Sequence, residues 1–348
     1  MGCNRVLWAA GVVSAVLGLA SSRPAAAQLT PDRTYYGIDR EIPVMVEMPE
    51  GGQDGQGEPT IVLFNPAGDP VARASVLAGR VDLATFFPIL WDQREPTLLY
   101  AQLYANGEAS QDLQDHGEPI GAPLVLQPLL TPRQAFPGGD QEIRWSGGPT
   151  LFSGLRVYVD KLIKLETTEG PMVFRLRPDE APNTAWHIRQ LVEGGFYTDI
   201  PFHRVVPTHS SGKPFVIQAG DPTGTGGGGP GEFIDLEPSE LIHDFGVLSM
   251  ARGGNPDSNG SQFFIALSRE ATVHLNGTYT AFGEAVEGAE AILAIERTPL
   301  EDPSLPPGHP RAGRPADPPR IVTAQLVDAS PFGTGPAPIR RPTDPGDR

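Results

Sequence analysis

The stretch GVLSMARGGNPDSNGSQFFI, residues 246–265, sets the pattern of the second half of the chain. It is preceded by FHRVV at residues 202–206, by FVIQAGD at 215–221 and by the glycine-rich run GTGGGGPG at 224–231. The tripeptide LNG at 275–277 and the pair FG at 282–283 follow it. Ordinary core packing or ordinary loops do not explain these segments in this order, so they are the first candidates for a functional site.

Taken singly, each segment has a plain interpretation. An arginine within a strand is usually a surface residue whose stem lies along apolar neighbours. The glycine-rich run leads into Pro230 without a Gly-Lys-Ser/Thr element, which disfavours a phosphate loop. Ser261 lacks the spacing of a nucleophile elbow, although seven histidines leave a serine hydrolase open. Clustered histidine or cysteine ligands are absent from the sequence, so no metal site is predicted.

The residues around these segments predict strands over 162–167, 172–176 and 321–327. A helix is predicted over 182–192, because Pro182 suits a first helical turn and apolar residues recur at helical spacing. Gly194-Gly195 offers a left-handed stop to that helix. A second helix is predicted over about 289–296, between Gly288 and Pro299.

Together and in this order, the segments closely resemble the cyclophilin family of peptidyl-prolyl cis-trans isomerases. The resemblance covers about residues 161–330 and indicates a bacterial-like, exported type. It implies a closed eight-stranded antiparallel barrel with a helix at each end, in a mainly β protein. It implies no metal and no organic cofactor. It says nothing about residues 28–160.

Carried over by position, the resemblance places the catalytic arginine at Arg204. The proline-binding pocket falls on Phe215, Val216, Phe264 and Leu275, with Gln218 and Gln262 on its polar side. The other positions that it implies in substrate binding are Gly224, Ala251, Arg252, His274 and Tyr279. Phe263 alternates with Phe264 along one strand and is expected in the core.

The chemistry suits these residue types. Rotating an X-Pro bond means twisting an amide whose resonance imposes a barrier of roughly 18–20 kcal/mol. As conjugation is lost the proline nitrogen becomes basic, so a fixed cationic donor such as Arg204 binds the twisted state better than the flat one. An apolar pocket holds the ring and keeps water away.

The first half of the chain has a different character. Between residues 28 and 160, β-favouring runs at 42–48, 60–64, 76–87, 97–104 and 123–130 alternate with glycine, proline and asparagine breakers. No helical period is convincing there, so a small antiparallel sandwich of unknown role is predicted. His116 and the scattered carboxylates are assigned to solvated loops.

The two ends of the chain are expected to lie outside the folded units. Arg5, an apolar run and Ala25-Ala26-Ala27 are typical of a signal peptide over 1–27, which predicts a periplasmic or extracellular protein without a stable membrane span after cleavage. A retained anchor is the alternative. Residues 331–348 are rich in proline and glycine and are predicted to be disordered.

Composition narrows the partners. The only cysteine, Cys3, precedes the apolar run, so the processed chain is expected to lack thiols and disulfides. A formal net charge of -16 opposes binding to nucleic acid. The expected partners are therefore proline-containing polypeptides, bound by a monomer. The alternative is a proline-binding adaptor or chaperone module with little turnover.

Residues 208–214 depart from the compact family pattern as an insertion, either a surface loop or a gate at the pocket. His274 also departs, since drug-sensitive members of the family carry tryptophan there. Because the indole donor and stacking surface are lost, we expect weak inhibition by cyclosporin in an assay of the purified chain. Inhibition at nanomolar concentration would refute this expectation.

Overall fold

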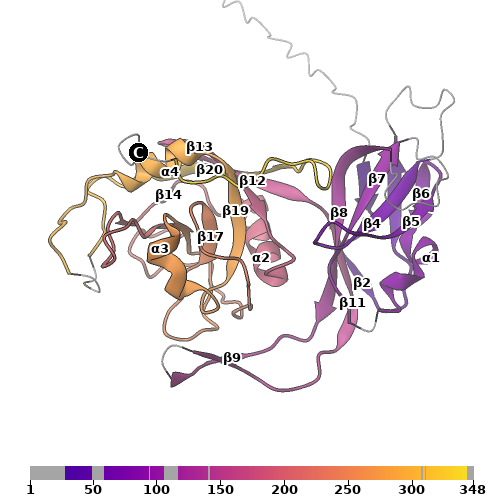
Figure 1. Cartoon of the computed structure of the whole chain (residues 1–348), viewed down its shortest axis with the longest axis horizontal. Coiled ribbons are helices and arrows are strands. Elements are labelled where there is room, and N and C mark those ends of the chain that lie inside the picture. Colours follow the sequence, from indigo (N-terminus) through magenta and orange to yellow (C-terminus); the bar gives the residue numbers. More distant parts are fainter. Residues whose placement is uncertain are drawn as a thin grey trace, which may run out of the picture.

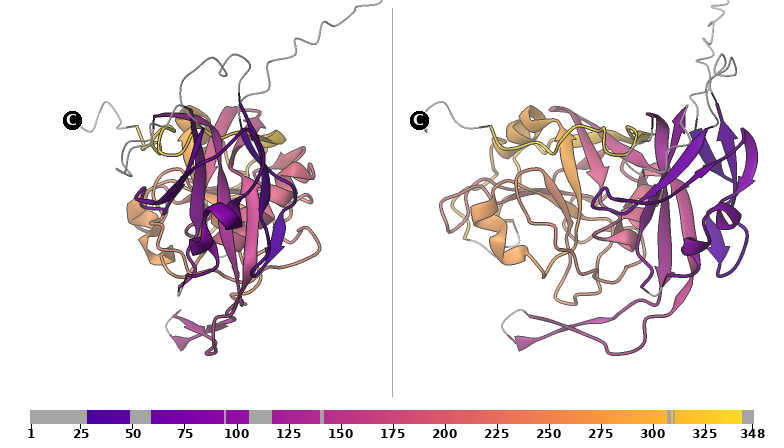
Figure 2. Two further views of the ribbon diagram at one scale, coloured as in Figure 1. Left: turned by 90° about the vertical axis from the view of Figure 1, so that its right-hand side faces the viewer. Right: turned by 45° about the vertical axis from the view of Figure 1, so that its right-hand side comes forward.

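The structure is a computed structural model that describes residues 28–48, 59–93, 95–105, 117–139, 142–306, 309 and 311–342. The expected signal peptide, His116 and Cys3 lie outside these residues. Figures 1 and 2 show two β-rich halves side by side, joined directly where one strand follows another. In the described residues, no helix is both long and apolar enough to cross a membrane.

The first half consists of two packed antiparallel sheets and a small hairpin. The three-stranded sheet has the order β1-β3-β6 and the six-stranded sheet the order β2-β11-β8-β7-β4-β5. A shared hydrophobic cluster lies between them, with Leu29 and Val44 from one sheet and Leu63, Leu103 and Val157 from the other. The strands are β1 (Gln28–Pro31), β2 (Tyr35–Gly37), β3 (Pro43–Glu47), β4 (Thr60–Phe64), β5 (Pro70–Ser75), β6 (Gly79–Asp82), β7 (Leu99–Ala105), β8 (Glu118–Leu130), β9 (Ala135–Pro137), β10 (Ile143–Trp145) and β11 (Phe152–Val159).

The prediction of one strand over 76–87 is wrong from residue 83 onward. Only β6 is extended, and the short helix α1 (Leu83–Phe86) and the 3-10 helix η1 (Pro88–Leu90) follow it. The Asp82 carboxylate accepts hydrogen bonds from the amides of Ala84 and Thr85, so an N-cap turns the chain where the apolar run alone indicated a continued strand.

The second half is a curled antiparallel sheet of nine strands in the order β14-β20-β12-β13-β19-β17-β18-β16-β15. A single large cluster of buried apolar residues lies inside the curl, including Phe174, Phe202, Ile217, Ile265 and Phe282. The strands are β12 (Lys161–Thr167), β13 (Gly170–Leu176), β14 (Ile200–Pro201), β15 (Arg204–Val206), β16 (Val216–Ala219), β17 (Val247–Met250), β18 (Phe263–Ala266), β19 (Ala281–Glu287) and β20 (Arg320–Asp328).

The strand order shows that the prediction of a closed eight-stranded barrel is wrong. The hydrogen-bonded ladder has two ends, β14 and β15, which only Phe202 and His203 separate along the chain. At this break the amides bond to a loop instead of a strand: Phe202 N to Pro319 O at 2.8 Å and Val205 N to Gly313 O at 2.7 Å. The sheet curls strongly but its ladder does not close.

The two longer helices are where the sequence predicted them. Helix α2 (Pro182–Glu193) has proline in its first turn, and Ala185, Ile188 and Val192 are buried. Gly195, not Gly194, takes the left-handed conformation after it, with φ of 75°. Helix α4 (Ala289–Glu296) follows β19, and the short α3 (Arg269–Thr272) and η3 (Val273–Leu275) complete the set.

An aromatic interface joins the halves. Trp186 of α2 packs on Tyr158 of β11 with ring centroids 4.9 Å apart, and the Arg156 guanidinium lies 4.9 Å from the Trp186 ring centroid. Arg189 of the same helix donates to Val159 O at 2.8 Å. The outer face of the six-stranded sheet is therefore buried against the second half instead of facing solvent.

The segment after Ser330, predicted to be disordered, has a defined course through Pro342 and is called the C-terminal strap. The Phe332 ring stacks on Phe64 with centroids 5.1 Å apart, and its amide donates to Gln102 Oε1 at 2.7 Å. Further along, the Ile339 amide bonds to Ala285 O, and Arg341 pairs with Glu296 at 2.8 Å. The proline- and glycine-rich composition predicted disorder because it does not show that Phe332 and Ile339 pack into the fold.

Replacing Phe332 with alanine is expected to destabilise the chain by about 2 kcal/mol, since its ring contacts with Phe64 and Tyr100 are lost. The measurement is the free energy of unfolding in urea. Phe233, which is 71% exposed, provides the matched Phe233→Ala control. Equal stability of the two variants would contradict the strap's role.

Candidate active site

Neighbouring strands of the second half send alternate side chains to two environments. Val205, Ile217 and Ile265 point into the large core cluster. Their neighbours Arg204 and Gln218 are register partners on β15 and β16, and Gln218 faces Phe264 on β18. Because successive residues of a strand point to opposite faces, Arg204, Gln218 and Phe264 share the face away from the core.

A second, smaller apolar cluster lies on that face. Phe264 is 5% exposed, its ring stacks on His243 at 5.8 Å, and Tyr279 meets it edge-on at 5.9 Å. The members of this cluster are Val216, Phe264 and Leu275, with Val206, Phe215, Ala251 and Tyr279 partly buried around them. The predicted pocket residues are thus brought together in one place.

A chain of side-chain hydrogen bonds borders this cluster. Arg204 NH1 donates to Gln218 Oε1 at 3.3 Å, and Gln218 Nε2 donates to Gln262 Oε1 at 3.0 Å. Gln262 Nε2 in turn donates to the carbonyls of Gly226 and Gly228, at 3.0 and 2.9 Å. Burial lowers the pKa of Arg204, but from a value so high that the guanidinium keeps its charge.

Asp221 organises the glycine-rich loop. Its carboxylate accepts from Thr223 N at 2.7 Å and Gly226 N at 2.6 Å. Burial alone would raise its pKa, but hydrogen bonds from Thr223, Gly228 and Gly226 outweigh it and lower the pKa to about 2. A Cβ on Gly228 would lie 2.0 Å from Asp221 Oδ1, so only glycine fits there. Gly224 itself packs near Pro201, and the loop reaches Gln262 through Gly226 and Gly228 instead.

The insertion at 208–214 folds over the apolar cluster. The His209 ring stacks on Phe215 with centroids 4.7 Å apart and on His274 with centroids 5.6 Å apart. Phe215 and His274 also stack on each other at 5.6 Å. Burial lowers the pKa of His274, and the neighbouring His209 lowers it further. These three rings form one wall of the site, so the insertion borders the pocket.

Arg252 and Ala251 occupy the opposite side. The Arg252 guanidinium donates twice to Thr278 O, at 3.2 and 2.9 Å, and lies 4.5 Å from the Tyr279 ring centroid. The Ala251 amide donates to Gln262 O at 2.9 Å. That amide is thus already used within the fold and is not free to pair with a docked chain.

Sequence reasoning gave no role to three residues that shape the site. The sequence around His209 indicates only a polar loop, and Asp221 is part of the FVIQAGD segment without a predicted function. His243 lies under Phe264 through hydrogen bonds to Asn276 and Ser249, at 2.8 and 2.9 Å. Asn276 is 33 positions away from His243, so no local pattern could reveal this contact.

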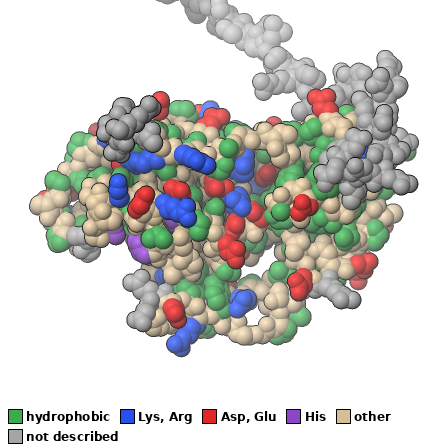
Figure 3. All heavy atoms as spheres, viewed as in Figure 1, with side chains coloured by type: hydrophobic (Ala, Val, Ile, Leu, Met, Phe, Trp, Pro, Cys, Tyr) green, Lys and Arg blue, Asp and Glu red, His purple; other side chains and the backbone are tan. Residues whose placement is uncertain are grey.

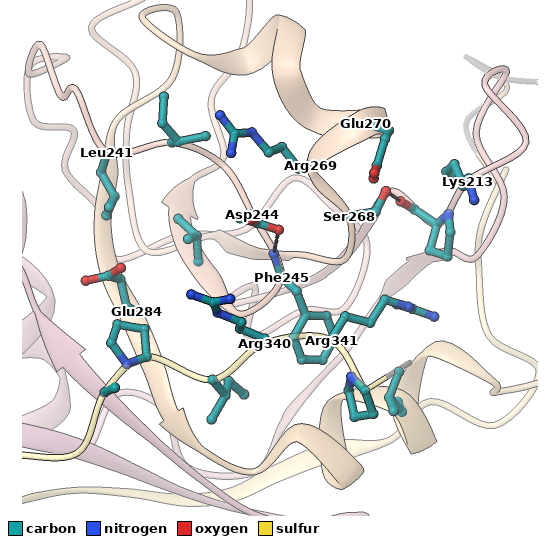
Figure 4. A pocket seen from close by; sticks show the side chains of 18 of the residues that line it. Lys213, Leu241, Asp244, Phe245, Ser268, Arg269, Glu270, Glu284, Arg340 and Arg341 are labelled. Carbon is teal, nitrogen blue, oxygen red and sulfur yellow. Dashed lines mark hydrogen bonds between the residues drawn. The ribbon is translucent and has the colours of Figure 1, made fainter. Parts of the chain in front are cut away.

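A cavity of about 1260 Å³ lies elsewhere, between α3, α4 and the C-terminal strap. Figure 4 shows Arg269, Arg340 and Glu270 around it, with Asp244 accepting a hydrogen bond from the Phe245 amide at 2.7 Å. Charges of both signs line it, and Arg204, Gln218 and Gln262 do not. Within the described residues, no group of three or more His, Cys, Asp or Glu side chains could hold a metal ion.

Comparison with known proteins gives a consistent result for the second half. Residues 162–326 match the family model described as cyclophilin type peptidyl-prolyl cis-trans isomerase/CLD. A peptidyl-prolyl cis-trans isomerase-like 1 protein of Gibberella zeae is 36% identical over 173 residues, which are 48% of this chain and 94% of that protein. The isomerase ppi1 of Schizosaccharomyces pombe is 38% identical over 152 residues, 42% of this chain and 92% of that protein.

Longer relatives match only in part. The chain spans 24% of the isomerase CYP65 of Arabidopsis thaliana, at 40% identity over 149 residues. A crystal structure of a Cryptosporidium parvum cyclophilin type isomerase matches 49% of this chain and 99% of its own, with 32% identity and a TM-score of 0.42. The curated relatives from Gibberella zeae, Schizosaccharomyces pombe and Arabidopsis thaliana are eukaryotic, so they give no support to the expected bacterial-like character.

Proposed function

This chain belongs to the cyclophilin-type peptidyl-prolyl cis-trans isomerases, and we propose that Arg204 and the apolar cluster beside it rotate X-Pro bonds in unfolded or partly folded proteins. The observation that carries the proposal is the position of Arg204. Its guanidinium is oriented by Gln218 at 3.3 Å, on the strand face that also carries Val206 and Phe264.

Arg204 serves as the donor in the rotating state. The flat amide offers its nitrogen no lone pair, whereas the twisted amide does, so a donor held in place stabilises the rotated bond selectively. The chain from Gln218 through Gln262 to the carbonyls of Gly226 and Gly228 supports this placement. A preorganised donor needs little rearrangement as the bond turns.

The apolar cluster holds the proline ring. Phe264, Val216 and Leu275 are almost fully buried, and Phe215 and Tyr279 flank them. An apolar floor excludes water from the amide and strengthens the field of Arg204. The wall formed by His209, Phe215 and His274 places the insertion where it limits which residues beside the proline are accepted.

The clients and compartment follow from the whole sequence. We propose exported clients, because residues 1–27 have the composition of a signal peptide and uncatalysed X-Pro rotation takes tens of seconds or longer. The net charge of -16, and the interspersed acidic and basic side chains on the face in Figure 3, favour a monomer that does not bind nucleic acid.

An adaptor that binds proline segments with little turnover is the second candidate. The observation that favours it is the insertion, since His209 covers part of the cluster that the substrate ring needs. NMR exchange on a short Ala-Pro peptide separates the two, because an adaptor leaves the exchange rate at background.

Replacing Arg204 with alanine is expected to lower kcat/KM on an Ala-Pro peptide by about 100-fold or more, the size of effect found when a preorganised donor is removed. The measurement is a protease-coupled assay, with circular dichroism to show that the fold is kept. Arg204→Lys retains the charge without the planar fork and should recover only part of the rate. Unchanged turnover in Arg204→Ala would remove Arg204 from the mechanism.

Acidification is expected to lower kcat/KM through His274. Its pKa is lowered by burial and by His209, so the ring is neutral at pH 7 and becomes charged only below the ordinary imidazole range. A charged His274 ring weakens its stacking on His209 and Phe215, which lowers kcat/KM by about three- to tenfold if about 1 kcal/mol is lost.

The measurement is the pH profile of kcat/KM between pH 5 and 8, the range in which imidazoles titrate. His274→Phe keeps a ring without a titrating group and should flatten the acidic limb. An unchanged acidic limb in His274→Phe would assign the effect to another imidazole, such as His203, whose pKa burial also lowers.

A further inference from the structure

We propose that the hairpin formed by residues 131–139 and 142–151, here named the β-arm, binds the unfolded client chain beside the catalytic pocket. The proposal rests on the proposed function, because the bound chain is the one whose X-Pro bond is rotated. It gives the first half of the chain a role: its two packed sheets hold the β-arm in position.

The β-arm projects from the first half toward the second. It connects β8 to its neighbour β11 in the six-stranded sheet, and Figure 1 shows it running beneath the second half. Its strands β9 and β10 pair only with each other in the described part of the chain. A two-stranded hairpin is at best marginally stable alone, so its position depends on contacts at its base and along its length.

One of these contacts reaches the loop that borders the site. The Ala135 amide of β9 donates to Asp257 Oδ2 at 3.0 Å, and Asp257 Oδ1 accepts from the Leu236 amide at 2.9 Å. Asp257 belongs to the loop 253–258, which begins directly after Arg252. That loop is closed on itself by Ser258 Oγ, which accepts from the Gly253 amide at 3.0 Å. The β-arm is thus attached at Asp257, six positions along the chain from Ala251 of the apolar cluster.

The β-arm presents apolar side chains that its own fold does not use. Phe136 is 49% exposed and Leu151 is 63% exposed, whereas Ala135 between strand and loop is 3% exposed. Arg144 is the register partner of Phe136, and the Arg133 guanidinium lies 5.6 Å from the Trp145 ring centroid. In the sequence 131–151 these two arginines are matched by Asp140 and Glu142, so the segment is close to neutral in a chain with a net charge of -16.

An unfolded polypeptide fits this surface better than a folded partner. Strand β10 leaves one edge unpaired in the described part of the chain, and an extended chain can add to such an edge through backbone hydrogen bonds. Strand β9 offers no such edge, because the Ala135 amide is bound to Asp257 and Pro137 has no amide hydrogen. Exposed aromatic and aliphatic side chains give affinity for apolar residues without demanding a fixed sequence. A client whose proline lies in the apolar cluster would therefore continue along the loop 253–258 onto the β-arm.

The experiment compares full-length variants on two substrates. Phe136→Ser with Leu151→Ser removes the apolar side chains of the β-arm. Leu77→Ser with Phe86→Ser is the matched control, with the same residue types at exposed positions away from the β-arm. The substrates are an Ala-Pro tetrapeptide, too short to reach the β-arm, and reduced carboxymethylated ribonuclease T1, whose refolding is limited by X-Pro rotation.

We expect the β-arm variant to keep its activity on the tetrapeptide. On the ribonuclease its kcat/KM should fall about fivefold, mainly because KM rises, which corresponds to about 1 kcal/mol of lost binding. The control should match the unmodified chain on both substrates. Equal activity of the β-arm variant and the control on the ribonuclease would overturn the proposal.

Cross-linking tests binding without relying on turnover. Photoreactive benzoylphenylalanine at position 136 should cross-link to the unfolded ribonuclease, and the same group at position 77 should not. Equal cross-linking at both positions would also overturn the proposal. If the unmodified chain does not turn over the tetrapeptide, the proposed isomerase function is wrong. The cross-linking result would still show whether the β-arm binds the unfolded chain.

Discussion

The orientation of Arg204 by Gln218 is the interaction on which the site depends. A free guanidinium on a long side chain would sample many positions, and its field would be spread over all of them. Gln218 is itself held by Gln262, which is held by two carbonyls of the glycine-rich loop, so the direction of one donor is set by a loop that Asp221 shapes. Replacing a loop glycine such as Gly228 therefore disturbs the arginine without touching it.

The sequence predicted the parts of the molecule that depend on local or strictly ordered patterns. Helix α2, strand β4 and the residues around Phe264 were found because proline, helical spacing and alternation act over a few positions. Position along the chain did not reveal His209 or His243, since the rings that they contact come from other segments. The C-terminal strap was missed for a related reason: its composition resembles a disordered tail, and only its partners order it.

The two halves are joined so closely that each completes the other's packing. The outer face of the six-stranded sheet carries Val62, Tyr100 and Val125, and it is covered by Trp186 of α2 and by Phe332 of the strap. Arg156 and Arg189 add cationic contacts to the same aromatic residues. This junction is what gives any element of the first half a defined position relative to the isomerase site.

The strap has a consequence for how the chain is made. Phe332 leaves the ribosome long after Phe64 and Tyr100, the rings that it stacks against. During synthesis Phe64 and Tyr100 therefore lack this cover until residue 332 has emerged. Aromatic surface that stays exposed in a growing chain favours self-association, so the strap protects the first half only after the second half has been made.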